Sequence, residues 1–144
     1  MILTITPNPA IDRTVEIPGF RAGGTFAVES LASRCAGKGI NVSRVLAALG
    51  VRSTCTGLVG GGEVAWYNSE VSAAGVTPDF VSTGGRVRLN TTVIDPGTSG
   101  ETHIRERGGE VRIVGISERA LRVMKLLSLD RVVRFYPNGA QMAP

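Results

Sequence analysis

The chain has 144 residues, of which 42% are hydrophobic and 19% charged, and this composition fits one soluble globular domain or one lobe of a larger protein. No apolar stretch approaches the roughly 20 residues of a membrane span, and no signal peptide is recognisable. The two cysteines are too few for a disulfide scaffold. We therefore expect a cytoplasmic protein. The net charge of +4 raises the question of nucleic-acid binding, but the basic residues form no stripe interleaved with aromatic ones, so we expect neither a nucleic-acid nor a membrane partner.

The pattern of apolar residues predicts strands and helices that alternate along the chain, separated by turns rich in glycine and proline. Strands are predicted at 2–6, where the strand is expected to be buried, and at 14–17, 25–31, 53–59, 78–82, 88–94, 101–106 and 131–136. Helices are predicted at 40–49, 63–74 and 118–127, the last of them after an N-cap at Ser117. This alternation indicates an α/β fold with a partly parallel sheet, to which the short strands at 14–31 and 88–106 are expected to add a small separate sheet.

Residues 36–43, with the sequence AGKGINVS, stand at the start of the helix predicted at 40–49. Glycines let the backbone approach a ligand closely, and a helix N-terminus offers unpaired N–H groups that suit an anion. Lys38 adds a positive charge, and Asn41 adds both a hydrogen-bond donor and an acceptor. The spacing fits neither a Walker A loop nor a dinucleotide-binding fingerprint. On these residues alone, a polar or anionic ligand site and an ordinary tight turn with an exposed lysine remain alternatives.

Further motifs surround this stretch at a characteristic spacing. Asn8-Pro9-Ala10-Ile11-Asp12 follows the first strand, Gly23-Gly24-Thr25-Phe26 follows a turn, Gly50 and Gly60 follow residues 36–43, and Arg88-Leu89-Asn90-Thr91 opens a later strand. Together these motifs resemble the PfkB branch of the ribokinase-like carbohydrate kinases, and within it the 1-phosphofructokinases and tagatose-6-phosphate kinases. The resemblance runs from Met1 to about Val133.

The resemblance implies a ribokinase-like three-layer α/β core with a small β-sheet lid over the sugar site. It also implies ATP-dependent, Mg²⁺-assisted phosphorylation of a sugar phosphate such as fructose 1-phosphate or tagatose 6-phosphate. In such proteins the lid often serves as a dimer interface. Residues 1–133 would then be the N-terminal half of a PfkB-type kinase domain, with lid strands at about 14–31 and 88–106, and residues 134–144 would be a divergent tail.

The resemblance also assigns residues to the sugar hydroxyls. Asp12 is similar to the aspartate that accepts hydrogen bonds from two hydroxyl groups, for which a carboxylate is suited. Gly37 and Gly39 resemble the glycines that bring the backbone to the sugar, and Asn41 resembles their hydroxyl-binding partner. The alternatives are a turn-capping role for Asp12 and a role at the helix end for the Asn41 amide.

A second set of residues is assigned to the phosphate that the substrate already carries. Arg88 is similar to an arginine at the base of the lid, where a guanidinium group binds phosphate with two hydrogen bonds. Lys38 fits the same task, with a solvated lysine as the alternative reading, and Arg86 and Arg105 are candidate helpers. The only histidine, His103, is expected to be a surface or packing residue of the lid and not a catalytic base.

The sequence departs from the family pattern at three places. Ala36 replaces a glycine, and Arg105-Glu106-Arg107-Gly108 stands where relatives often have Asn-Glu-Pro-Gly. After residue 133 the resemblance stops, before the half of the domain that holds the ATP site, the catalytic base and the anion hole. One hypothesis is a frameshift near codon 133, because one codon choice for 133–136, read one base later, encodes Ser-Gly-Ser.

The sequence therefore predicts a sugar-phosphate kinase by family, with this chain carrying the sugar-binding part and inactive by itself. The ribokinase-like core is expected to be truncated before the nucleotide-binding half, so the sites for ATP and Mg²⁺ are not expected in this chain, and no residue is assigned a catalytic or metal-binding role. The alternatives are a non-catalytic module that binds sugar phosphate or pairs through its lid, and a decayed gene product without function.

Overall fold

The computed structural model describes residues 2–98, 100–107, 112–114, 118, 122, 125 and 134–136. The chain forms two compact units, Met1–Arg107 and Gly108–Pro144. In the second unit, β9 (Arg112–Val114) pairs in parallel with β10 (Arg134–Tyr136), so the described part of the strand predicted at 131–136 is confirmed. Ser117 and most of the helix predicted at 118–127 lie outside the described residues. The predicted boundary at 133 stays a prediction.

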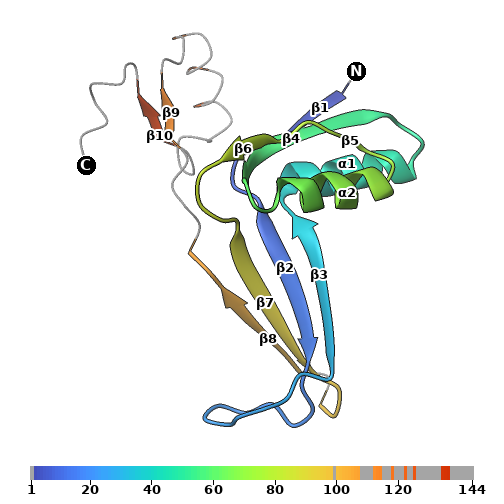
Figure 1. Ribbon diagram of the computed structural model, residues 1–144, viewed down its shortest axis with the longest axis vertical. Coiled ribbons are helices and arrows are strands. Elements are labelled where there is room, and N and C mark those ends of the chain that lie inside the picture. The colour runs from blue at the N-terminus through green and yellow to red at the C-terminus, as the bar shows by residue number, and fades with distance from the viewer. Residues whose placement is uncertain are drawn as a thin grey trace. The chain divides into compact units, whose positions relative to one another are not determined.

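The core of the first unit is a parallel sheet with helices packed against it (Figure 1). Its strands are β1 (Ile2–Thr6), β4 (Ser53–Gly60), β5 (Thr77–Pro78) and β6 (Val81–Thr83), and its helices are α1 (Lys38–Ala48) and α2 (Val64–Ala73). Strand β4 pairs in parallel with the other three. These elements agree with the predicted ones to within about two residues, except that the strand predicted at 78–82 is two short strands, β5 and β6. Among the described residues, no helix is long and apolar enough to cross a membrane.

Both helices pack on one face of this core sheet. Cys55 and Val59 of β4 face Ile40 of α1 and Tyr67 and Val71 of α2, and all five side chains are buried. The hydroxyl-bearing side of β1 shares this face, because Thr4 lies opposite Cys55 in the parallel register.

The opposite face of the core sheet is apolar and exposed in the described residues. It carries Leu3 and Ile5 of β1, Leu58 of β4 and Val81 of β6, each more than two fifths exposed. The prediction of a buried first strand is therefore wrong for its apolar side chains. Apolar residues alternate with threonines in β1, and the smaller threonine side chains are the ones that pack beneath α1.

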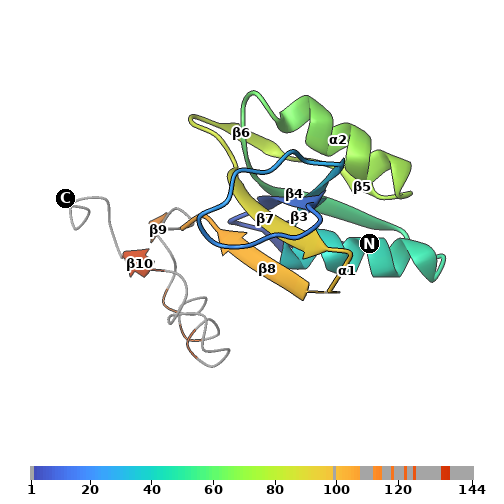
Figure 2. The same cartoon turned by 90° about the horizontal axis from the view of Figure 1, so that it is seen from below.

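A second sheet, which we call the lid sheet, extends from the core (Figures 1 and 2). Its spatial order is β3-β2-β7-β8, with bounds β3 (Ser30–Ala36), β2 (Ala10–Glu16), β7 (Arg88–Asp95) and β8 (Gly100–Arg105). Strand β2 runs antiparallel to β3 and parallel to β7, and β8 is antiparallel to β7. The expectation of a small separate sheet is confirmed.

Two strands of the lid sheet differ from their predicted positions. The strand predicted at 14–17 begins earlier, at Ala10, and the strand predicted at 25–31 lies instead at 30–36. The alternation at 25–31 has another cause, because Phe26 packs with Phe20 against the small core of Val15, Ile17 and Val93 at the far end of the sheet. The chain between Ile17 and Ser30 is thus a loop that covers this core.

Candidate functional site

A row of polar side chains crosses the lid sheet on one face. The strand register places Arg34 of β3 opposite Asp12 of β2, Asp12 opposite Asn90 of β7, and Asn90 opposite Arg105 of β8. Residues that are paired across strands point to the same face of a sheet. We call these four residues the cross-strand row. It brings a carboxylate and an amide together at the centre, with a guanidinium group on each edge strand.

Asp12 and Asn90 form the centre of the row. The Asn90 Nδ2 donates a hydrogen bond to the Asp12 Oδ1 over 2.8 Å. The Asn90 Oδ1 is buried and has no hydrogen-bond partner among the described residues. A buried acceptor without a partner carries a free-energy cost that a ligand hydroxyl can relieve. The pair therefore offers a ligand one carboxylate and one amide oxygen, both of which accept hydrogen bonds.

Two adjoining cavities open over this face, and both are lined by Asp12 and Thr92. The cavity on the β8 side has a volume of about 260 Å³ and is also lined by Arg88, Asn90, Thr91, His103 and Arg105. The cavity on the β3 side has a volume of about 450 Å³ and is also lined by Thr14, Arg34, Cys35, Ala36, Asn41 and Arg44. Each cavity thus holds two arginines, and among the residues that the structure describes Asp12 is the only carboxylate that lines either of them.

The positive charge of the cavities is largely uncompensated. Within the described part of the chain, Arg34, Arg88 and Arg105 form no ion pair. Arg88 donates from Nε to the Pro9 carbonyl oxygen over a long 3.4 Å, which leaves its terminal nitrogens available. Guanidinium groups without a carboxylate partner favour an anionic ligand, and phosphate is one that they bind with two parallel hydrogen bonds.

Arg44 has a structural task in addition to lining the cavity. Its Nη1 donates to the Cys35 carbonyl oxygen over 2.8 Å and its Nη2 lies 3.1 Å from the Cys35 Sγ. These contacts join α1 to the end of β3, next to the cavity. Burial raises the pKa of the Cys35 thiol, so the sulfur is protonated at neutral pH and is not a reactive thiolate.

The glycines before α1 have a packing reason. Gly37 has a φ of 152°, and a Cβ there would overlap the Thr6 side chain, while a Cβ on Gly39 would lie 2.7 Å from the Ile5 carbonyl oxygen. The Ile40 backbone N–H donates to the Thr6 Oγ1 over 3.1 Å, so a threonine at the end of β1 satisfies one of the free N–H groups of the helix. These glycines let α1 begin directly against β1.

The predicted site residues divide between the two cavities and their surroundings. Asp12 lines both cavities, Arg88 lines the one on the β8 side, and Asn41 lines the other. The exposed Lys38 and the two glycines that flank it line neither cavity, although Ala36 does. The roles predicted for all these residues stay predictions.

The two arginines predicted as helpers, Arg86 and Arg105, lie in different surroundings. Arg105 lines the cavity on the β8 side, whereas Arg86 is outside both cavities and forms an exposed ion pair with Glu106 at 3.1 Å. The Leu89 backbone N–H donates to the Glu106 carboxylate, and this bond, followed by the charge of Arg86, holds the pKa of that carboxyl below its usual range. Glu106 therefore joins β7 to the end of β8.

Three residues that line the site were not predicted from the sequence. Asn90 had a signal, because it lies two residues after Arg88 on the same strand and so faces the same side. Arg34 had none, because the strand that carries it was predicted five residues too early. Arg44 lies in the predicted helix, and only the packing of α1 against β3 brings it to the site.

Comparison with known proteins agrees with the family resemblance that the sequence motifs indicate. The sequence profile of the pfkB family carbohydrate kinases matches residues 3–112. The chain is 34% identical over 119 residues to the 1-phosphofructokinase of Haloferax volcanii, an alignment that covers 82% of this chain and 38% of that protein. It is 32% identical over 94 residues to the 1-phosphofructokinase of Vibrio cholerae, covering 65% of this chain and 30% of that protein.

The chain belongs to the pfkB family of carbohydrate kinases. A crystal structure of phosphofructokinase-2 from Escherichia coli in complex with substrates and products has the same fold, with a TM-score of 0.70 at 22% identity. That alignment covers 90% of this chain and 40% of the Escherichia coli chain, so this pfkB chain spans less than half the length of the Escherichia coli and Haloferax volcanii proteins. The predicted ribokinase-like core with a lid is confirmed.

The donor groups of the site do not fit a magnesium ion. Mg²⁺ is held by carboxylates together with phosphate and water oxygens, whereas the two cavities contain several arginines and one carboxylate, which already accepts a hydrogen bond from Asn90. Among the described residues, no group of three His, Cys, Asp or Glu side chains comes close enough to hold a metal. The site suits a hydroxylated anion better than a cation.

Proposed function

We propose that this chain forms the sugar-binding part of a PfkB-type sugar-phosphate kinase, with fructose 1-phosphate or tagatose 6-phosphate as substrate. The observation that carries the proposal is the Asp12–Asn90 pair, with its free acceptor oxygens, between arginines that have no carboxylate partner in the described part of the chain. The sequence relationship to 1-phosphofructokinases supports the same class of substrate.

The chemistry of each group fits a part of a sugar phosphate. The Asp12 carboxylate accepts hydrogen bonds from sugar hydroxyls, and the Asn90 amide oxygen, which is buried, accepts one more. Arg88 and Arg105 neutralise the phosphate that the substrate carries, because both line the cavity beside Asn90. Holding the sugar in this way positions it for in-line attack on a phosphoryl donor, which is the larger part of such catalysis.

ATP and Mg²⁺, which the family implies, would supply the phosphoryl group and neutralise its charge. We also propose that residues 1–144 do not catalyse the phosphoryl transfer by themselves. A base must accept the hydroxyl proton, and the candidate His103 is already engaged, with Nδ1 3.0 Å from the Thr92 hydroxyl and Nε2 3.5 Å from Glu101. Asp12 is the remaining carboxylate of the cavities, and we assign it to hydroxyl binding.

A second candidate function is a non-catalytic module that pairs with another copy through the lid sheet. Leu31 on β3 and Ile104 on β8 face the side opposite the cross-strand row, and their side chains are 62% and 56% exposed. Exposed apolar side chains on a sheet favour association. Sedimentation of the chain at several concentrations tests this candidate, which fails if the chain stays monomeric and Leu31→Ser changes nothing.

The main proposal is tested by calorimetric titration of the chain with fructose 1-phosphate and with tagatose 6-phosphate. We expect binding of at least one of them, and a loss of about tenfold in Asp12→Asn, because one charge-assisted hydrogen bond is removed. Asp79→Asn is the matched control, since this exposed carboxylate lines neither cavity. Equal affinity of the wild type and Asp12→Asn would contradict the assignment, and turnover in an ATP-coupled assay would overturn the proposed inactivity of the chain.

A further inference from the structure

Strand β1 stands at an edge of the core sheet (Figure 1). Within the described part of the chain β4 is its only partner, so one row of backbone N–H and C=O groups of β1 points outward without a neighbouring strand. Its sequence, ILTIT, contains neither a charged residue nor a proline. Charges and prolines are the residues with which proteins ordinarily protect such an edge. The edge of β1 is therefore suited to pairing with a further strand.

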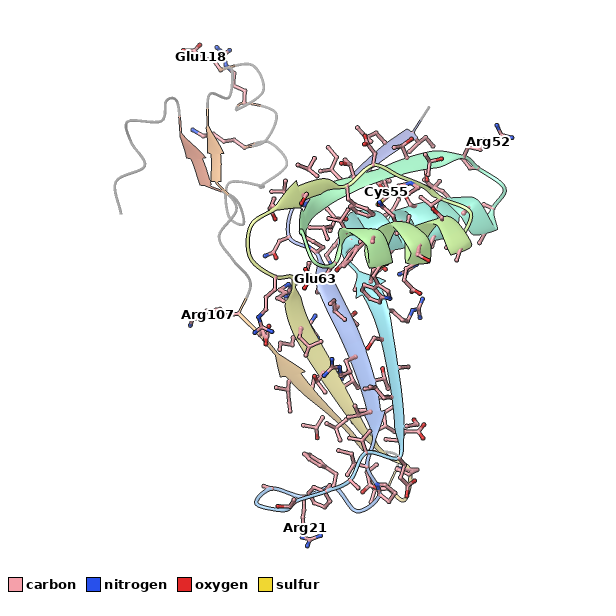
Figure 3. The ribbon with its side chains drawn as sticks, viewed as in Figure 1. Arg21, Arg52, Cys55, Glu63, Arg107 and Glu118 are labelled. Atoms are coloured by element: carbon pink, nitrogen blue, oxygen red, sulfur yellow. The ribbon has the colours of Figure 1, made fainter. Side chains whose placement is uncertain are left out.

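The side chains on the open face of β1 are apolar. Leu3 and Ile5 lie on this face, and each is more than half exposed. The threonines of β1 point to the other face, where Thr4 lies opposite Cys55. Cys55, which is labelled in Figure 3, packs among the side chains of the helices and so marks the covered face. The free edge thus has an apolar side that the described residues leave uncovered.

Helix α1 lies on β1 and runs antiparallel to it. The Ile40 backbone N–H donates to the Thr6 Oγ1, at the end of the strand. Further along the helix, the Ser43 hydroxyl lies 2.7 Å from the Thr4 hydroxyl, which is further back along the strand. The surface beside the free edge of β1 therefore includes one flank of this helix.

That flank of α1 is apolar as well. Ala47 is on the flank that faces α2, because its side chain lies close to Gly75 at the end of that helix. Val42, Leu46 and Leu49, spaced four and three residues apart, lie on the opposite flank, toward the free edge of β1. Val42 and Leu49 are each more than half exposed. Strand and helix together present one apolar strip, which we call the edge strip.

We propose that a second copy of this chain pairs with β1 in antiparallel orientation, with the two Thr4 residues opposite each other on a two-fold axis. The two core sheets then form one continuous sheet. In this register Leu3 of each copy lies opposite Ile5 of the other, so apolar cross-strand pairs form on the open face. The pairing does not depend on the proposed function, because the cross-strand row belongs to the lid sheet.

The helices fit the same two-fold axis, which is perpendicular to the sheet and leaves both copies of α1 on one face. Ser43 bonds the hydroxyls of Thr4 on β1 and Ser53 on β4, so α1 lies between these two strands. Two strand spacings, roughly 10 Å, then separate the axes of the two helices. This is the distance at which helices pack. The flanks that carry Val42 and Leu49 face each other across the axis.

The charges of the helices are compatible with this arrangement. Because the two copies of α1 run antiparallel, the N-terminus of each lies near the C-terminus of the other, and their opposite partial charges attract. Lys38, in the first turn, then lies near a last turn that carries no basic residue of its own. The pairing thus brings no two like charges of α1 together at its ends.

The edge strip is large enough for a small dimer. Full burial of a leucine, isoleucine or valine side chain removes roughly 60–120 Å² of apolar surface. The exposed members of the strip are 41–72% exposed and together present roughly 150–350 Å² per copy; they are Ile2, Leu3, Ile5, Val42 and Leu49. A specific interface buries about 500 Å² or more per copy, of which more than half is apolar. The strip supplies this apolar share.

Sedimentation velocity of the complete chain at several concentrations tests the proposal. We expect a dimer at micromolar concentration that dissociates on dilution. Ile5→Lys should raise the dissociation constant of the dimer at least about tenfold, because each dimer then holds two charges in an apolar strip. Ile104→Lys is the matched control, since Ile104 is an isoleucine of the lid sheet with 56% exposure against 60% for Ile5, and we expect it to keep the dimer.

Cysteine cross-linking tests the register. Directly opposed residues of antiparallel strands have Cα atoms about 4.5–5.5 Å apart, within the range of a disulfide. A Leu3→Cys chain mixed with an Ile5→Cys chain and oxidised with diamide should therefore form a covalent dimer. Either variant alone should react more slowly, because identical residues are diagonal neighbours at about 7–8 Å. The wild type is the blank, since its own two cysteines are fully buried.

Several results would overturn the proposal. They are a wild type that stays monomeric at all concentrations, open-ended aggregates in place of a dimer, and equal losses of dimer in Ile5→Lys and Ile104→Lys. Circular dichroism melting verifies the fold of both lysine variants. If Ile5→Lys does not fold, the cross-linking decides, and a mixture that reacts no faster than the separate variants contradicts the register. The titrations with sugar phosphates are independent of these results, so the proposed function is judged separately.

Discussion

Tyr67→Phe is the substitution whose effect the structure predicts most directly. Tyr67 lies on α2, its side chain is fully buried, and its hydroxyl donates a hydrogen bond to the Ala10 carbonyl oxygen over 2.7 Å. Ala10 is the first residue of β2, so this bond joins the helical core to the strand that carries Asp12. The substitution removes one oxygen atom and leaves the aromatic ring in place.

The size of the expected loss of stability follows from the contacts that Tyr67→Phe keeps and the one that it removes. The ring contacts with Trp66 and Phe80, at centroid distances of 5.3 and 5.5 Å, are retained in the variant. The Ala10 carbonyl loses its donor in a buried environment, and an unsatisfied buried acceptor costs about 1–3 kcal/mol. We therefore expect the free energy of unfolding to fall by about 1–3 kcal/mol, with a larger fall for Tyr67→Leu, which also loses the ring contacts.

Urea unfolding of the complete chain, followed by tryptophan fluorescence, measures this difference. The pH dependence provides a second readout. Burial raises the pKa of the Tyr67 phenol above its ordinary value, which is about 10 in an unfolded chain. A raised pKa means that the contribution of the phenol is complete below pH 10 and is lost as the pH rises further. The advantage of the wild type over Tyr67→Phe should therefore shrink above about pH 10.

Equal stability of the wild type and Tyr67→Phe at pH 7 would refute this reasoning. It would mean that the Ala10 carbonyl finds another donor, so that the hydrogen bond does not hold β2 to the core. A stability difference that stays constant from pH 7 to pH 11 would refute the second part, since a buried neutral phenol must be favoured over its ionised form.

Three further changes test other contacts. Gly39→Ala should lower the melting temperature strongly, because its Cβ would lie 2.7 Å from the Ile5 carbonyl oxygen, whereas Gly62→Ala, with no atom within 4 Å, should not. Asp95→Asn should be less stable than the wild type at pH 7, because the backbone N–H groups of residues 19 and 97 bind the Asp95 carboxylate and hold its pKa below the usual range. The stability advantage of the wild type is therefore present above about pH 4 and is lost on acidification. Thermal melts of both proteins at about pH 3 and pH 7 would show this difference. Ser43→Ala should reduce the free energy of unfolding by about 1–3 kcal/mol in urea, because its buried hydroxyl bonds those of residues 4 and 53.

Local sequence patterns predicted the elements of the core better than those of the lid. The strand at 53–59 and the helices at 40–49 and 63–74 are each bounded by glycine or turn residues and need only local information. The lid strand at 30–36 was misplaced because alternation at 25–31 arises there from a loop in which Phe26 packs against Phe20. A period of two shows that alternate side chains are buried, not that they belong to a sheet.

The site depended on long-range pairing that no local pattern contains. Asp12 and Asn90 are 78 residues apart in the sequence and are joined by the parallel pairing of β2 with β7. The motifs that include Asp12 and Arg88 were visible separately, and the resemblance to a known family linked them. The register that adds Arg34 and Arg105 to the same row became visible only in the structure.

The apolar side of the lid sheet explains why this polar row is stable in position. Val15 lies opposite Val93 in the register and both are buried, on the face opposite Asp12 and Asn90. A slip of one residue between β2 and β7 would turn every side chain of the slipped strand to the opposite face, so that in β2 the valine would leave the small core and the aspartate would enter it. The small core that Val15 and Val93 form with Ile17 therefore selects the register that aligns Asp12 with Asn90. Substitution of Val93 by a polar residue should then weaken sugar-phosphate binding as well as stability, although it contacts no ligand.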